Sequence, residues 1–203
     1  MKGFMKRDLT LMVPTLKLYG GIFAVMLAVS LFTSMGVNFF AVYACVFTFS
    51  GVLGLFSYDE ANHWQAYAAA APGGRRGQVE ARYALSFLMS AGVTLILLLA
   101  YLIRPEDRAM AGIAFLYGGL GLVYSALCLP LCYRFGVVRG RTLILMIVVI
   151  SGILGAAGSV AALSGGGAEK FPAGVGLLVL AGGILVNLIS RRISIRIMAA
   201  KEL

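Results

Sequence analysis

Six long apolar segments leave this chain few folds to choose from. A bilayer core about 30 Å thick is crossed by a helix of roughly 17–25 mostly apolar residues. With 61% hydrophobic and 12% charged residues, the chain has too little charge to cover a soluble domain of its length. The sequence therefore predicts an all-α, polytopic membrane protein with six transmembrane helices. The segments run approximately over 19–37, 39–56, 84–103, 110–131, 142–163 and 173–190.

The chain is organised as one membrane domain over residues 1–203. Its first residues mix charged and apolar side chains and hold no small-residue cleavage site, so the first apolar segment is expected to remain as a span. The first two spans are joined by almost no chain, and we expect a tight turn around Gly36 to Asn38. The other breaks fall at 104–108, 133–141 and 164–172.

The basic residues predict how the helices are oriented. With six spans both termini lie on one side of the membrane, and that side carries fourteen of the 17 Lys and Arg residues. Short loops rich in Lys and Arg stay in the cytoplasm. Both termini and the segment 57–83 are therefore expected to be cytoplasmic. The net charge of +9 then reflects topology and gives no reason to expect nucleic-acid binding.

The segment before the first span, residues 1–18, alternates basic and apolar side chains. This pattern is typical of an amphipathic helix that lies in the headgroup plane and turns its lysines toward anionic lipid. An unstructured cytoplasmic tail is the alternative. Pro14 is expected to kink this helix or to mark its end. The apolar residues are Phe4, Met5, Leu9, Met12 and Leu16, and the basic ones are Lys2, Lys6, Arg7 and Lys17.

The spans lack the residues that several membrane functions need. No Asp, Glu, Lys, Arg or His lies at the centre of a span, which argues against a transporter coupled to protons or sodium through buried carboxylates. The only histidine, His63, is predicted to be cytoplasmic, so no catalytic set can form in the bilayer. Cys128 and Cys132 have no His or acidic residue beside them to complete a metal site. We therefore predict no catalytic residue, bound cofactor or metal in this chain.

Glycine is frequent in the last three spans. Small residues allow close helix approach in lipid, so these glycines serve either packing within the chain or a subunit interface. They also permit local bending, which a pathway that opens and closes would use. The residues are Gly112, Gly118, Gly119 and Gly121, then Gly152, Gly155 and Gly158, and finally Gly174, Gly176, Gly182 and Gly183.

The segment 57–83 is the one long polar stretch. Ser57 and Glu60 have the spacing of a capping box, which predicts a short helix from about residue 59 to 71, stopped by Pro72. On that helix Trp64 and Tyr67 share a face with Glu60 and His63. The two aromatic residues suit either membrane-interface anchors or a surface that docks a protein. A second helical stretch runs from about Arg75 into the third span.

The same segment carries a family resemblance. Its pattern of acidic, aromatic and basic positions from Asp59 to Tyr83 is similar to that of small ABC-2 type transporter permeases, the six-helix membrane subunits of bacterial ATP-binding-cassette exporters. The basic amphipathic N-terminus, six spans, cytoplasmic termini and chain length also fit that family. The matching positions are Phe56, Ser57, Tyr58, Asp59, Glu60, Trp64, Tyr67, Pro72, Arg75, Val79, Arg82 and Tyr83.

The resemblance implies a specific role for the cytoplasmic segment. In that family it is a coupling helix, which fits a cleft on the ATPase subunit and transmits nucleotide-driven motion to the spans. The chain has no G-x-x-x-x-G-K-[ST] phosphate loop, so ATP and Mg²⁺ are expected on a separate ATPase subunit. The resemblance also implies a second permease subunit, identical or related, in a bacterial cytoplasmic membrane. The predicted ATPase-coupling residues are Asp59, Glu60, His63, Trp64, Tyr67, Pro72, Arg75 and Arg76.

The expected function is that of a non-catalytic permease subunit in an ABC exporter. Because the spans lack buried charge, the expected cargo is amphipathic or lipophilic, such as a peptide or drug. One alternative is the substrate-binding membrane subunit of a vitamin importer, which would need a polar outer pocket that the short outer loops do not offer. Another is a non-transporting scaffold or immunity protein that docks partners through residues 57–83.

Overall fold

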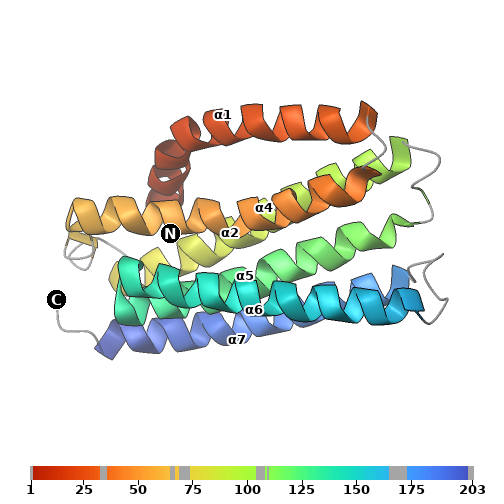
Figure 1. Cartoon of the computed structure of the whole chain (residues 1–203). Helices are drawn as coiled ribbons and strands as arrows, with labels where there is room; N and C mark the ends of the chain where they lie inside the picture. The colour runs from red at the N-terminus through yellow and green to blue at the C-terminus, as the bar shows by residue number, and fades with distance from the viewer. Residues whose placement is uncertain are drawn as a thin grey trace.

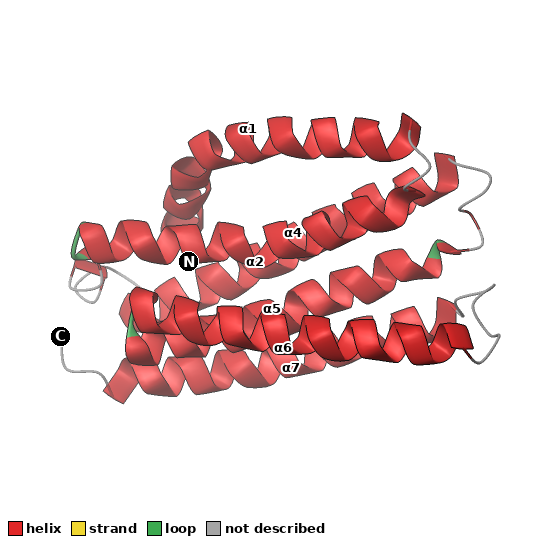
Figure 2. Ribbon diagram, in the orientation of Figure 1, coloured by secondary structure: helices red, strands yellow, loops and turns green. Residues whose placement is uncertain are grey.

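The computed structural model confirms the all-α prediction. It describes residues 2–32, 36–64, 67–68, 74–103, 108, 110–164 and 173–200. Within these residues six long helices lie roughly side by side in one bundle, and Figure 2 shows no strand among them (Figures 1 and 2). The helices are α1 (Lys2–Phe32), α2 (Gly36–Ala61), α4 (Gly74–Ile103), α5 (Gly112–Phe135), α6 (Val137–Ser164) and α7 (Ala173–Ala200).

Five of these helices are long and apolar enough to cross a membrane, namely α1, α2, α4, α5 and α7. Their most apolar windows have mean hydropathies between 1.7 and 2.2. The remaining predicted span, 142–163, falls within α6, whose side chains from residue 151 onward lie outside the described residues. Helix length and composition therefore make the chain a multi-pass membrane protein.

The predicted turn between the first two spans is not at the predicted residues. We expected it around Gly36 to Asn38, but those residues form the first turn of α2, and α1 ends at Phe32. The first four N–H groups of a helix have no intrahelical partner, so a glycine or an asparagine is readily accommodated there. The residues that sequence reasoning took for a break are thus a helix start.

Helix α1 is continuous but bent. It runs through Pro14, and Figure 1 shows its N-terminal part turned toward the other helices while the longer part follows the bundle. A proline inside a helix removes one backbone hydrogen bond and crowds the preceding turn, which produces such a kink. The predicted N-terminal segment is therefore helical, but it continues into the first span within one helix, and its place in the headgroup plane stays a prediction. We call residues 2–13 the N-terminal arm.

Helices α5 and α7 approach each other at glycines. A Cβ added at Gly119 would lie 2.7 Å from the Val179 carbonyl, and one added at Gly183 would lie 2.7 Å from the Gly119 oxygen. Gly176 faces the Gly112 backbone in the same way. These glycines serve packing within the chain, one of the two roles expected for them.

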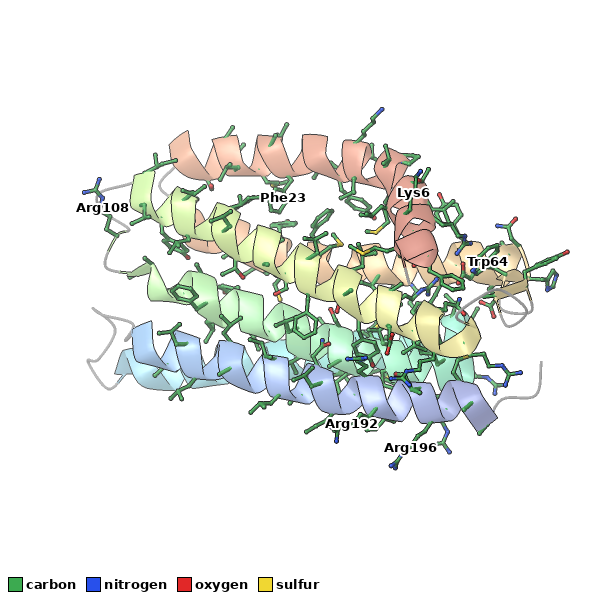
Figure 3. The ribbon with its side chains drawn as sticks, turned by 180° about the vertical axis from the view of Figure 1, so that it is seen from behind. Lys6, Phe23, Trp64, Arg108, Arg192 and Arg196 are labelled. Carbon is green, nitrogen blue, oxygen red and sulfur yellow. The ribbon has the colours of Figure 1, made fainter. Side chains whose placement is uncertain are left out.

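The two ends of the bundle differ in what they carry. The N-terminal arm, the junction between α2 and α4, and the C-terminal end of α7 lie at one end (Figure 1). In Figure 3 Lys6, Trp64 and Arg196 mark this end, and Arg108 lies at the opposite one. The fold thus brings the junction between α2 and α4 beside the N-terminal arm and the C-terminal end of α7.

Candidate functional site

The site of interest is the junction between α2 and α4. We predicted that a separate helix starts here with Ser57 as its cap, and this is wrong. Helix α2 continues to Ala61, and the Ser57 hydroxyl donates to the Leu53 carbonyl one turn earlier at 3.5 Å. The change from apolar to polar residues at position 57 therefore marks no helix start, because none of the next few side chains interrupts the backbone hydrogen bonds.

The chain turns directly after α2. His63 adopts a φ of 49°, a left-handed conformation in which histidine is found more often than most residues. The Tyr58 carbonyl at the helix end accepts two hydrogen bonds from Asn62, one from its backbone N–H at 3.2 Å and one from its side-chain amide at 2.8 Å. Residues 64 and 67–68 are again helical. Pro72, one of the predicted coupling residues, lies outside the described residues.

Asp59 is the centre of a buried polar cluster. Only 1% of the residue is exposed, and its carboxylate accepts hydrogen bonds from three side chains. Arg7 of the N-terminal arm donates at 2.8 Å, Gln78 at 3.0 Å and Arg82 at 2.5 Å. A buried carboxylate needs this degree of pairing, because an uncompensated charge in a protein interior costs several kcal/mol. Asp59 therefore joins α1, α2 and α4.

Arg82 is fully buried in the same cluster. Its guanidinium lies 4.0 Å from the centre of the Phe56 ring and donates to the Leu55 carbonyl at 3.4 Å. Asp8 of the N-terminal arm lies 3.7 Å from its Nε. Two arginines and two carboxylates thus balance one another. We call Arg7, Asp8, Asp59 and Arg82 the junction ion-pair cluster.

Trp64 faces inward. It packs against Phe4, Ala68 and Ala81, and the Arg7 guanidinium lies 3.8 Å from the centre of its ring. This corrects our expectation that Trp64 and Tyr67 form one exposed aromatic face. The side chain of Trp64 holds the N-terminal arm against the junction, where a cation above an aromatic face contributes about 0.5–2 kcal/mol.

The other predicted residues of the junction face outward. Glu60, His63 and Tyr67 are exposed, with Tyr67 at 69%. Arg76 follows at the start of α4, where its exposed side chain pairs with Glu80 at 3.1 Å. We call Glu60, His63, Tyr67 and Arg76 the outward surface.

The start of α4 is also fastened to the end of α7. Arg75 donates to the carbonyls of Met198 and Ala199 at 3.2 and 3.3 Å, which caps the C-terminus of α7. Glu80 accepts a hydrogen bond from Arg191 at 2.6 Å. The hydrogen bonds from Arg191 and then Arg76 lower the pKa of Glu80 below its usual value of 4.5.

Three buried hydroxyl groups extend this attachment one turn further along. The Tyr83 hydroxyl lies 2.7 Å from Ser190 Oγ and 2.8 Å from Ser194 Oγ. Ser190 donates in turn to the Ala126 carbonyl of α5 at 2.5 Å. Sequence reasoning noted Tyr83 only as a family position and missed both serines. Their i, i+4 spacing on α7 was the available signal.

The predicted coupling residues thus fall into two groups. Of those that the structure describes, Asp59, Trp64 and Arg75 hold helices together, whereas the outward surface is exposed. Arg7, Asp8 and Arg82 were not predicted as site residues, although charged residues beside a predicted span are the signal that would have found them. Within the described residues no group of three His, Cys, Asp or Glu side chains is arranged to hold a metal ion.

Comparison with known proteins identifies the family of the chain. A family model described as ABC-2 family transporter protein matches residues 3–199, nearly the whole chain. Members of this family are typically non-catalytic permeases that work with an ATPase partner. No curated protein and no solved structure gave a significant match. The family resemblance of the sequence is therefore confirmed, and the chain belongs to the ABC-2 family of transporter proteins.

Proposed function

We propose that this chain is the permease subunit of an ABC exporter and that the outward surface docks its ATPase subunit. The observation that carries the proposal is the division of the junction into two sides. One side is anchored to three helices through buried charges, and the other presents Tyr67, His63, Glu60 and Arg76 to a partner. Aromatic residues and arginine dominate the energetics of protein interfaces.

The anchored side can pass a displacement of the outward surface on to the transmembrane helices. A push on the outward surface acts on the end of α2 and the start of α4, which share the Asp59–Arg82 pair. The same pair holds the N-terminal arm, because Arg7 binds Asp59 and Asp8 lies beside Arg82. Arg75 and Glu80 pass the displacement to α7. ATP and Mg²⁺ belong to the partner in this proposal, which places the junction on the cytoplasmic face of a bacterial membrane.

The cargo that this architecture favours is amphipathic or lipophilic, such as a peptide or a drug. The sequence places no charged residue at the centre of a span, so the membrane part offers no counter-charge for a small ionic solute. The pathway would form between this chain and a second, identical or related, permease subunit. ATP-driven closure of the two ATPases would then move the paired bundles between two states.

Docking can be tested by co-purification. The chain is expressed with its neighbouring genes and solubilised in detergent as wild type and as Tyr67→Ala/Arg76→Ala. Because hot-spot residues contribute about 2 kcal/mol or more each, we expect an ABC ATPase to co-purify with wild type and at least tenfold less with the variant. The matched control is Arg192→Ala/Arg196→Ala, which removes two exposed arginines from α7 (Figure 3) and should leave capture unchanged.

Two results would contradict the proposal. If the ATPase is expressed but co-purifies with no form of the chain, a scaffold that docks other partners becomes the better explanation. If it co-purifies equally with all forms, it binds away from the outward surface. The cargo class is tested separately by adding amphipathic peptides or small polar solutes to the purified complex. Stimulation of ATP hydrolysis by the polar solutes alone would rule out a lipophilic cargo.

A further inference from the structure

A cavity separates part of α1 from the rest of the bundle. It has a volume of about 320 Å³ and lies between α1 and α4, with Phe47 of α2 also in its wall. Phe23 projects from α1 toward this space (Figure 3). From Leu85 to Ile96 the cavity follows α4 for about 16 Å at 1.5 Å per residue. It is therefore long and narrow.

The walls of the cavity are apolar throughout. Every lining residue is Leu, Met, Phe, Val, Ile or Gly. A bound water needs two to four polar partners, and this lining provides no side chain that could serve as one. The occupant must therefore be apolar where it touches the walls. In a helix bundle within a bilayer, the abundant apolar molecule is the lipid acyl chain.

Two glycines on facing walls keep the cavity open. Gly20 of α1 and Gly92 of α4 both line it. A Cβ added at either position would meet no atom within 4 Å. These two differ from Gly119 and Gly183, where a Cβ would collide with a backbone. Close packing of α1 and α4 does not explain the absence of a side chain at Gly20 and Gly92.

One mouth of the cavity carries a positive charge. A second, open hollow of about 520 Å³ is lined by Lys6, Thr10 and Pro14 and shares Leu9 with the cavity. Lys6 is exposed, and within the described residues no carboxylate pairs with it. Its neighbour Arg7 is already bound to Asp8 and Asp59. Lys6 is thus available to an anionic group in the hollow beside the N-terminal arm.

We propose that this cavity binds one phospholipid with an anionic headgroup, with an acyl chain along Gly20 and Gly92 and the phosphate at Lys6. The charge of Lys6 favours an anionic over a zwitterionic headgroup, and the length and lining of the cavity match a single chain. The bound lipid fills the space beside α1 and supports that helix. This inference does not depend on the ATPase partner or on the cargo.

The experiment is native mass spectrometry of the purified full chain in detergent, with added phosphatidylglycerol or phosphatidylcholine. Wild type should retain one phosphatidylglycerol per chain. Gly92→Leu, whose side chain enters open space, should block the cavity partway along and abolish retention of both lipids. Lys6→Gln should reduce the preference for phosphatidylglycerol about fivefold, the effect of one basic residue at a membrane surface. Gly182→Leu and Lys17→Gln are the matched controls and should behave like wild type, because neither residue lines the cavity or the hollow.

Other outcomes overturn the proposal. Equal lipid retention by wild type and Gly92→Leu would show that bound lipid lies elsewhere on the bundle. A loss of chain dimers in Gly92→Leu with unchanged lipid retention would show that a second copy of the chain occupies the cavity. An unchanged headgroup preference in Lys6→Gln would show that the phosphate does not bind at Lys6. Thermal unfolding of each variant verifies that it is folded, and a failure to capture the ATPase would leave all of these results unaffected.

Discussion

Helix α1 and the α5–α7 pair are held in the bundle by opposite means. Of the most apolar window of α1 only 6% is buried within the chain, against 56% in α5. Helices α5 and α7 meet at Gly119, Gly176 and Gly183, where backbone lies against backbone. Helix α1 is held instead by the junction ion-pair cluster at one end and, along its span beside the cavity, by ring contacts of Tyr19 and Phe23 with α2. One region is held by backbone contact and the other by side chains.

The difference shows which part of the molecule can move. Closely packed backbones have few alternative arrangements, because a small shift creates clashes or voids along the whole contact. A helix held by side chains can repack along its span while its charged end stays in place. We therefore expect α5 and α7 to move as a unit and α1 to move relative to them.

The largest expected effect comes from releasing the charged end of α1. Asp59→Asn leaves Arg82 buried without its closest counter-charge, and breaking a buried pair in this way costs about 3–5 kcal/mol of unfolding free energy. Hydrogen exchange should show lost protection in the N-terminal arm and unchanged protection in α5 and α7. Glu60→Gln, at an exposed neighbouring position, should change stability by no more than about 0.5 kcal/mol. Similar losses in both variants would show that the cluster does not hold α1.

A smaller effect is expected from the other side of the comparison. Gly119→Ala places a Cβ against the Val179 backbone and should cost about 1–3 kcal/mol through overpacking. Gly182→Ala adds the same atom where nothing lies within 4 Å and should cost nothing. Denaturant titration of the two variants measures the difference. If Gly119→Ala were tolerated as well as Gly182→Ala, α5 and α7 would not be a fixed unit.

The smallest effect is a pH dependence at the attachment of α4 to α7. The pKa of Glu80 is lowered in the folded chain, so its contribution is present above the unfolded value of about 4.5. That contribution is lost as the pH falls through the folded pKa. The loss is modest because Arg76 and Arg191 are partly exposed. Melting temperatures measured from pH 7 to pH 3 should fall less steeply for Glu80→Gln than for wild type.

Hydropathy alone was sufficient to predict the helices, because a span of this length in lipid has few alternatives. The junction was harder to predict for two physical reasons. A polar residue such as Ser57 can follow an apolar run without ending the helix, so composition misplaced the boundary. The pairing of Asp59 with Arg7 and Arg82 depends on how α1, α2 and α4 are rotated about their axes. That rotation is fixed by contacts distant in sequence, which also turn Trp64 inward and Tyr67 outward.

The bend of α1 at Pro14 gives the helix two lengths that meet at an angle. The shorter length ends in the charged contact with the junction, and the longer one runs along the membrane part of the bundle. When the angle at the bend is kept, a small rotation of the short N-terminal arm moves the far end of the longer part through a larger distance. We therefore expect a small motion at the junction to become a larger one at the opposite end of the bundle.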